Sequence, residues 1–246
     1  MISTALFFAG IGAMALLADR QGGGSAQYGA DLGPVNLPAG ARAPGASFPP
    51  LPFAYDALQP WSSAETVRLH HDKLQASYVR KANNALQRMG APSPLGEPAD
   101  VRARRHFGAN MSLVFNTAGA MLHQLFWENL SPGPTPIPPF LEGAIRRDFG
   151  SMAAMQQQTR DLASLVGGSG WIVLVYSPYL SRLVLLPVLK HQNNWIPGSH
   201  PLMVLDLWEH AYYLDHPADR MSFVDGFWRH VNWPAVNERL RRALQG

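Results

Sequence analysis

A proline-rich stretch near the middle of the chain limits the possible folds more than any other feature. The segment "SPGPTPIPP", residues 131–139, holds five prolines. A proline inside a helix removes a backbone hydrogen bond and clashes with the preceding turn, so no helix can cross this segment. Helical patterns precede the segment, whereas short β-like runs appear only after it. The chain therefore divides here into two halves of different character.

The first half is predicted to be a helical hairpin. Ser62 or Ser63 is a suitable N-cap for a helix over residues 62–89, in which apolar residues recur at helical spacing. A loop rich in proline and glycine follows, and a second long helix covers residues 101–130. Two long helices joined by a short loop pack side by side. We therefore expect an N-terminal α-helical hairpin domain over residues 51–135.

The second half, residues 136–246, mixes helices and strands. One or two helices are expected over residues 139–166. Short apolar runs that are typical of strands follow at residues 167–178, 179–191 and 200–208, and helical patterns resume after them. The fold class is therefore α+β, with the helical hairpin domain followed by a C-terminal α/β domain.

The N-terminal residues are predicted to direct export. Residues 2–18 form an uncharged apolar run, which is short for a membrane-spanning helix and suits the core of a signal peptide. We interpret residues 1–18 as a signal peptide, with a membrane anchor as the alternative. Residues 19–50 form a Gly/Pro-rich linker. The expected location is periplasmic or secreted, and a membrane is a partner only if the first segment is retained.

Composition excludes several classes of function. The chain has no cysteine, which rules out disulfides, thiol catalysis and zinc–thiolate sites. The formal net charge is only +3, and acidic and basic residues are interspersed, so a nucleic-acid partner is not expected. Histidine and carboxylate side chains remain as possible metal ligands.

The stretch "LDLWEHAYYL", residues 205–214, holds the first candidate ligands. Asp206 ends an apolar run that we interpret as a buried strand. Burying an ionised carboxylate costs several kcal/mol unless a positive charge meets it. His210 lies about one helical turn further on and can approach the same point. Two interpretations stay open for this pair alone: metal ligands, or a hydrogen-bonded Asp–His pair that caps the next helix.

Histidines of the two hairpin helices extend this candidate site. His70 lies on the apolar face of the first helix, and the adjacent His71 points about 100° away from it. His123 lies among apolar residues of the second helix, with Gly119 leaving space on the same face. Taken singly, such histidines are more often ordinary core residues than ligands. Together with Asp206 and His210 they form a set that suits one iron or manganese ion, and zinc would also accept it.

A di-metal carboxylate site is not expected, because it requires Glu-x-x-His pairs on helices and the sequence contains none.

Several further motifs accompany "LDLWEHAYYL" along the chain: "LPFAYDALQPW", "LHHDKLQASYVRKANNAL", "HQLFWENLSP", "GSGW" and "FWRHVNW". Together, and in this order, these motifs resemble the iron/manganese superoxide dismutase family. The resemblance covers residues 51 to about 244 and is most specific in "LDLWEHAYYL". It implies a small three-stranded antiparallel sheet, one manganese or iron ion per subunit, superoxide as substrate and a homodimer.

The resemblance also implies individual roles. Its metal ligands fall on His70, His123, Asp206 and His210, which are the four residues selected above. Tyr78 matches a tyrosine at the mouth of the substrate channel. Glu209 matches an acid that reaches across the dimer to His210 of the partner subunit. The aromatic wall around the metal matches Trp127, Trp171 and Trp208.

The family's two metal types differ in the source of a glutamine that holds the metal-bound solvent. The iron type usually takes it from the second helix, at the position of Gly119 here. The manganese type has glycine there and takes the glutamine from the sheet, where Gln192 is well placed. The combination of Gly119 and Gln192 slightly favours manganese.

One departure from the family concerns the channel mouth. The family usually has a histidine where this chain has Leu74, and that histidine pairs with a tyrosine of the other subunit, here Tyr213. This bond cannot form, so the channel mouth is expected to be more apolar. Leu74 also motivates the alternative function, a catalytically weak or inactive metal-binding relative of the family.

Overall fold

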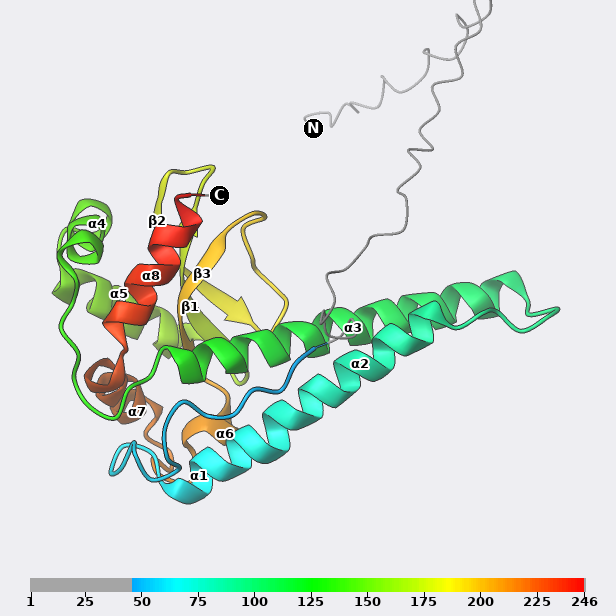
Figure 1. The fold of residues 1–246 in the computed structure, drawn as a ribbon, viewed down its shortest axis with the longest axis horizontal. Coiled ribbons are helices and arrows are strands. Elements are labelled where there is room, and N and C mark those ends of the chain that lie inside the picture. Colours follow the sequence, from blue (N-terminus) through cyan, green and yellow to red (C-terminus); the bar gives the residue numbers. More distant parts are fainter. Residues whose placement is uncertain (1–45, 246) are drawn as a thin grey trace, which may run out of the picture. The chain divides into compact units, whose positions relative to one another are not determined.

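The N-terminal half of the folded chain is a long helical hairpin (Figure 1). The structure, a computed structural model, describes residues 46–245. The first arm starts at Ser63, whose side chain accepts a hydrogen bond from the backbone N–H of Thr66. It continues through α1 (Ala64–Arg68), the π-helix η1 (Leu69–Gln75) and α2 (Ala76–Gly90), and α3 (Ala99–Glu128) forms the second arm.

Two helices follow the proline-rich stretch. α4 (Pro139–Phe149) begins at the last of its prolines, where a missing N–H costs nothing. It ends at Gly150, whose φ of 85° lies in the left-handed region that glycine adopts readily. Ser151 then caps α5 (Met152–Leu165). The segment predicted as one or two helices is therefore two.

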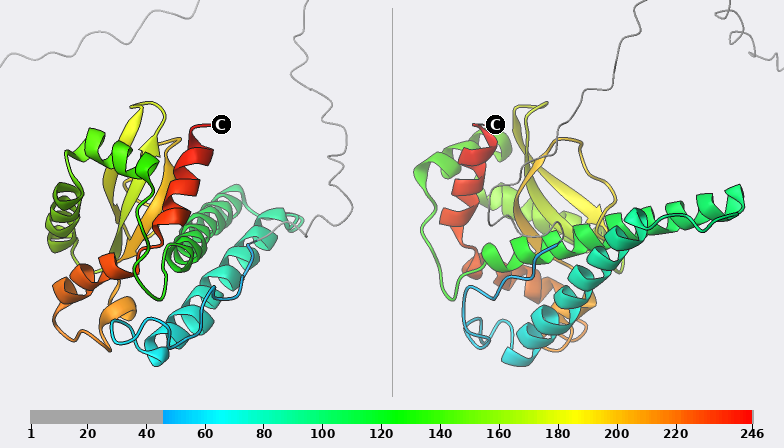
Figure 2. Two further views of the ribbon diagram at one scale, coloured as in Figure 1. Left: turned by 60° about the vertical axis from the view of Figure 1, so that its left-hand side comes forward. Right: turned by 45° about the vertical axis from the view of Figure 1, so that its right-hand side comes forward.

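The sheet has three antiparallel strands in the order β2–β1–β3. The strands are β1 (Gly170–Ser177), β2 (Arg182–Leu189) and β3 (His200–Asp206). Helices α4 and α5 lie against β2, α5 also lies against β1, and α3 and α8 lie against β3 (Figure 2). The central strand β1 is apolar almost throughout because it is buried on both faces.

Short helices complete the C-terminal half. They are α6 (Glu209–Tyr212), α7 (Arg220–Phe227), the 3-10 helix η2 (Trp228–His230) and α8 (Trp233–Ala243). The predicted fold class, a helical hairpin domain followed by an α/β domain with a three-stranded antiparallel sheet, is confirmed.

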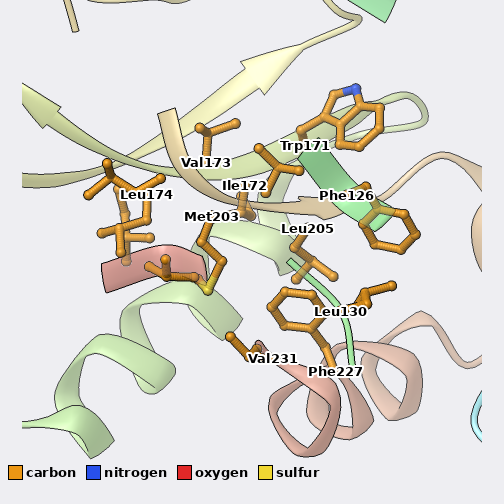
Figure 3. Packing of buried hydrophobic residues seen from close by; sticks show 14 of the residues in the cluster. Phe126, Leu130, Trp171, Ile172, Val173, Leu174, Met203, Leu205, Phe227 and Val231 are labelled. Carbon is orange, nitrogen blue, oxygen red and sulfur yellow. The ribbon is translucent and has the colours of Figure 1, made fainter. Parts of the chain in front are cut away.

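The hydrophobic core joins the two halves at the end of α3 (Figure 3). Phe126 and Leu130 leave the hairpin and pack with Leu205 of β3 and Phe227 of α7. Asn129, which is fully buried between them, accepts a hydrogen bond from the backbone N–H of Val204 at 2.7 Å. The hairpin is thereby held against the sheet at the point where β3 approaches its last residue.

Within residues 46–245, no helix is both long enough and apolar enough to cross a membrane. The predicted signal segment, residues 1–18, and nearly all of the predicted linker lie outside the described residues.

Candidate metal centre

Four segments that are far apart in the sequence bring four potential ligands together. His70 comes from η1, His123 from α3, Asp206 from the end of β3 and His210 from α6. One ligand atom from each lies within 4.8 Å of the others. Asp206 and His123 are fully buried, and His70 is almost so. The structure therefore brings together all four residues that the sequence predicts as ligands.

The Asp206 carboxylate lies close to the rings of all three histidines of the cluster. Asp206 Oδ2 lies 3.1 Å from His70 Nε2, 3.3 Å from His210 Nε2 and 3.8 Å from His123 Nε2. Although they lie 3.1 Å apart, His70 Nε2 and Asp206 Oδ2 are buried atoms without a hydrogen bond of proper geometry. Buried polar atoms are normally satisfied. A cation between them would satisfy both, so the donor set fits a metal ion.

Hydrogen bonds outside the cluster orient its lone pairs inward. His123 Nδ1 lies 2.6 Å from the carbonyl oxygen of Gly119, which can only accept, so Nδ1 carries the proton. The lone pair of the neutral ring is then on Nε2, which faces the cluster. The backbone N–H of Trp208 donates to Asp206 Oδ1 at 2.9 Å and leaves Oδ2 for the centre. Such supporting bonds are typical of metal-ligating side chains.

Burial sets the protonation states that a metal requires. It lowers the pKa of His70 to about 4 and that of His123 well below its usual value, so both rings are neutral at pH 7. Burial alone would raise the pKa of Asp206. The neighbouring His210 and His70 outweigh it and hold that pKa below its usual range. Two neutral imidazoles and an ionised carboxylate are ready to bind a divalent cation.

Both halves of the chain match known protein families. Residues 46–131 match "Iron/manganese superoxide dismutases, alpha-hairpin domain", and residues 138–239 match "Iron/manganese superoxide dismutases, C-terminal domain". The chain belongs to the iron/manganese superoxide dismutase family. Its predicted membership is therefore confirmed.

Curated members of the family cover most of this chain. It is 38% identical to "Superoxide dismutase [Fe]" of Pyrobaculum aerophilum over 81% of this chain and 94% of the relative. It is 39% identical to "Superoxide dismutase [Mn/Fe]" of Propionibacterium freudenreichii subsp. shermanii, over 80% and 97%. It is 36% identical to "Superoxide dismutase [Mn] 1" of Halobacterium salinarum, over 80% and 96%. Relatives named for iron, for manganese and for both metals thus occur together.

The three tryptophans that the family resemblance assigns to an aromatic wall surround the ligands. The Trp127 ring lies 4.8 Å from the His70 ring, and its indole N–H donates to Gln75 Oε1 at 2.8 Å. Trp171 lies 5.0 Å from His123, and Trp208 lies 5.6 Å from His210. Each of the three histidines of the cluster therefore has one tryptophan ring beside it.

Tyr78 lies beside the cluster, as the family resemblance implies. Its ring is 5.1 Å from that of His123. Burial raises the pKa of Tyr78 to about 12, so its hydroxyl stays protonated at neutral pH. Gly119 makes room for this ring, because a Cβ atom at Gly119 would lie 2.9 Å from it. The space predicted beside His123 is therefore occupied mainly by Tyr78.

Gln192, predicted to hold the metal-bound solvent, lies next to His191, and it is His191 that the structure buries beside the cluster. Gln192 is only half-buried, and its Oε1 accepts a 3.3 Å hydrogen bond from the backbone N–H of His191. His191 is fully buried, and its ring lies 4.7 Å from Tyr78 and 4.5 Å from Trp208. The turn after β2, with Lys190 at a φ of 55°, directs His191 inward.

Sequence reasoning missed His191 because a glutamine, the residue type expected by resemblance, stood next to it. One signal was available. The apolar run over residues 179–191 ends at this histidine, and alternation along a strand would have placed one of the two adjacent residues inward.

Glu209 and Tyr213 lie at the surface near His210. With Leu74 they line one pocket whose other walls are mostly apolar, completed by Leu69, Lys73, His210 and Leu214. Tyr213 and Leu214 are each more than half exposed. We call Leu69, Leu74, Glu209, Tyr213 and Leu214 the Glu209 patch. It adjoins the metal cluster through His210.

Proposed function

We propose that this protein is a superoxide dismutase that holds one manganese or iron ion at His70, His123, Asp206 and His210. One observation carries the proposal. His70 Nε2 and Asp206 Oδ2 are both buried, lie 3.1 Å apart and have no hydrogen-bond partners. Family membership supports the reaction and superoxide as its substrate.

The reaction turns two superoxide anions and two protons into one dioxygen and one hydrogen peroxide. The bound ion would accept one electron and then donate one electron. The protein's own residues hold the ion, exclude water and deliver protons. Tyr78 suits proton delivery because its hydroxyl is protonated at neutral pH. The tryptophans restrict entry to small species.

We assign to His191 the contact that the resemblance gave to Gln192. Trp171 Nε1–H donates to His191 Nδ1 at 3.1 Å. The proton of the neutral ring is therefore on Nε2, which is buried and has no partner. That N–H is available to hold a solvent or oxygen species beside Tyr78. Such a contact tunes a metal ion through its bound solvent.

The identity of the metal is proposed as manganese or iron. The slight preference for manganese rested on Gly119 together with Gln192. Gly119 still matches the manganese type, but we assign the contact of the glutamine to His191. Metal analysis of the native protein decides between the two ions.

We further propose a homodimer formed through the Glu209 patch. The patch exposes the apolar side chains of Leu69, Tyr213 and Leu214 on one surface, and an exposed apolar patch marks an interaction site. In such a dimer, Glu209 would accept a hydrogen bond from His210 of the partner subunit and fix the orientation of that ring. Leu74 replaces a polar residue at this contact, so apolar packing contributes more to it.

Export remains a proposal that rests on residues 2–18 alone. N-terminal sequencing of the protein isolated from its native host tests it. Cleavage near or shortly after residue 18 supports a signal peptide. An intact N-terminus in a membrane fraction supports an anchor.

The function is tested by reloading the metal-free protein with manganese or with iron and measuring superoxide consumption. Turnover with at least one ion is expected. His123→Ala should lose tight metal binding and activity while keeping its helix content by circular dichroism, because one of four ligands is gone. His106→Ala, on the same helix but outside the cluster, is the matched control.

Metal retention by His123→Ala would show that His123 is not a ligand. Tight metal binding by the unaltered protein without turnover for either ion would identify the inactive relative instead.

A further inference from the structure

A pocket that shares no residue with the metal cluster or the Glu209 patch lies where three segments of the chain meet. The segments are the chain before α1, the proline-rich stretch after α3, and the region of α7 and η2. The pocket has a volume of about 510 Å³, which suits a small organic ligand. We call it the Arg229 pocket, and its lining includes Trp61, Pro132, His216, Ser222, Arg229 and His230.

Ring contacts and hydrogen bonds hold the walls of the Arg229 pocket in place. The Trp61 ring stacks against the rings of Phe223 at 4.7 Å and of His230 at 5.0 Å. Its indole N–H donates to the Phe223 carbonyl at 2.9 Å. The backbone N–H of Ser131 donates to the His230 carbonyl at 2.7 Å, which ties the proline-rich stretch to η2. The walls are thus fixed before a ligand arrives, and this lowers the entropic cost of binding.

The lining of the pocket carries positive charge and no acidic side chain. Arg229 is exposed, and none of the ion pairs among residues 46–245 involves it. Burial lowers the pKa of His230, and the nearby charge of Arg229 lowers it further. An anion at this position would therefore meet a positive charge that no side chain of the described residues already neutralises.

The two histidines of the pocket each keep one ring nitrogen for a ligand. His216 Nε2 lies 2.8 Å from the Trp61 carbonyl oxygen, and His230 Nδ1 lies 3.1 Å from the Ser131 carbonyl oxygen. Because a carbonyl only accepts, these two nitrogens carry the protons of the neutral rings. Among the described residues, the other nitrogen of each ring has no partner and is not buried. On taking up a second proton, either ring would offer that nitrogen to an anion as a donor.

We propose that the Arg229 pocket binds a small organic anion, in which a carboxylate or phosphate group is attached to a ring or a short hydrocarbon chain. The charged group would lie at Arg229, whose planar guanidinium binds two oxygens of either group at once. The apolar part would lie against Trp61, Pro60 and Pro132. His230 stacks on Trp61 and so stands between the two parts of the ligand.

This binding does not rest on the proposed activity. The pocket takes its lining from both halves of the chain, so only the folded protein can bind the ligand. A ligand that binds only the folded state raises the temperature of unfolding as its concentration rises.

Isothermal titration calorimetry of the full metal-loaded chain tests the proposal with four probes. Phenyl phosphate and benzoate carry a ring and a charged group, whereas inorganic phosphate and acetate lack the ring. We expect phenyl phosphate, benzoate or both to bind one to one, at least about tenfold more tightly than the matching probe without a ring. The tighter of the two identifies the preferred charged group. The proposal is overturned if neither binds at up to about 10 mM, or if the ring brings no gain in affinity.

Two variants locate the bound probe. Arg229→Gln should weaken binding at least about tenfold, because it removes the fixed charge. Ser222→Glu should do the same by repulsion, and it should fold, since an acidic residue is favourable in the first turn of a helix, where Ser222 lies. Arg80→Gln, at an exposed position of α2, removes the same charge outside the pocket and should leave the affinity unchanged. The proposal is overturned if Arg229→Gln or Ser222→Glu binds the probe as tightly as the unaltered protein.

Thermal unfolding and activity give two further readouts. The probe should raise the unfolding temperature of the unaltered protein and of Arg80→Gln, and it should have much less effect on Arg229→Gln. Arg229→Gln and Ser222→Glu should keep their metal content and their turnover per metal ion, because neither residue belongs to the metal cluster. A probe that lowers turnover and binds Arg229→Gln unchanged would lie at the metal cluster instead, which overturns the proposal.

Discussion

A Cβ atom at Gly119 would lie 2.9 Å from the Tyr78 ring and 3.3 Å from the His191 ring. Gly119→Ala must therefore move one or both rings. We expect activity to fall by an order of magnitude or more with full metal content, because the ligands themselves are untouched. Overpacking of this kind costs about 1–3 kcal/mol, which offsets the gain of up to about 1 kcal/mol from alanine in a helix. Superoxide turnover per bound metal ion measures the effect.

Gly108→Ala is the matched control for this prediction. It lies on the same helix, and an added Cβ would meet nothing within 4 Å. This variant should keep its activity and gain about 0.5–1 kcal/mol in free energy of unfolding from helix propensity alone. Equal activity of the two variants would show that Gly119 has no role in placing Tyr78 and His191.

His191 gives the metal-free protein a pH dependence whose sign follows from burial. Its pKa is lowered to about 4, whereas an unfolded histidine titrates near 6.5. Between these values the unfolded state binds the proton and the folded state does not, so stability is lost as pH falls from about 6.5 to 4. From pH 7.5 to 5 this one group should cost about 2 kcal/mol.

Urea unfolding of the metal-free protein at pH 7.5 and at pH 5 measures this loss. His191→Gln should remove about 2 kcal/mol of the difference between the two pH values. If His191→Gln keeps the full pH dependence, the ring of His191 is not held neutral in the folded protein.

The site residues show what sequence can predict at this scale. Asp206 was identifiable because burying an ionised carboxylate at the end of an apolar run is costly unless a positive charge meets it. His191 was not, since the choice between two adjacent residues depends on the backbone conformation of one turn. The positive φ of Lys190 carries no clear mark in the sequence.

At the scale of elements, Asn129 joins the hairpin to the sheet. Its side chain accepts from Val204 N–H at 2.7 Å and donates to the Phe126 carbonyl at 3.0 Å, and its own carbonyl accepts from Asn232 N–H at 2.8 Å. Asn129→Ala would leave the Val204 N–H buried and unpaired and open a small cavity. We expect a loss of about 2–4 kcal/mol in free energy of unfolding, measured by urea denaturation.

Asn110→Ala on the same helix is the control. The Asn110 side chain is exposed and bonds only to the His106 carbonyl one turn away, so its loss should change stability by less than about 0.5 kcal/mol. A small effect at both positions would mean that packing alone holds the hairpin against the sheet.

Element boundaries were predictable where local chemistry fixes them. The prolines after residue 131 mark the end of the hairpin, and Ser63 marks its start. The π-turns of η1 were not predictable, although they carry His70, because their geometry depends on packing around the cluster. The C-terminal helical pattern is broken at Val231 and Asn232, where Asn232 caps α8 and Pro234 takes a first-turn position. That break was readable in the sequence.

At the scale of the molecule, four ligands separated by up to 140 positions in sequence meet within a few ångströms. Sequence patterns selected the four candidates, but they gave no distance between them. The distances follow from the packing of α3 across the sheet and from the β1–β3 register, which pairs Trp171 with Asp206.

The last prediction concerns the Glu209 patch as an interface. Leu214 is 61% exposed and lies beside Glu209 without taking part in the metal cluster. Leu214→Glu would bury a charge in an apolar contact, which costs several kcal/mol when the charge is unpaired. We expect the dimer to dissociate, and we expect activity to fall because Glu209 can no longer fix His210 of the partner subunit. Sedimentation, together with activity per metal ion over a dilution series, measures both effects.

The matched control is Leu165→Glu, because Leu165 is 83% exposed at the end of α5 and outside the patch. It should change neither mass nor activity. Leu214→Glu should lower both mass and activity, because the Glu209 patch touches the metal ligand His210. Leu214→Glu with unaltered mass and activity would place the dimer interface elsewhere on the molecule.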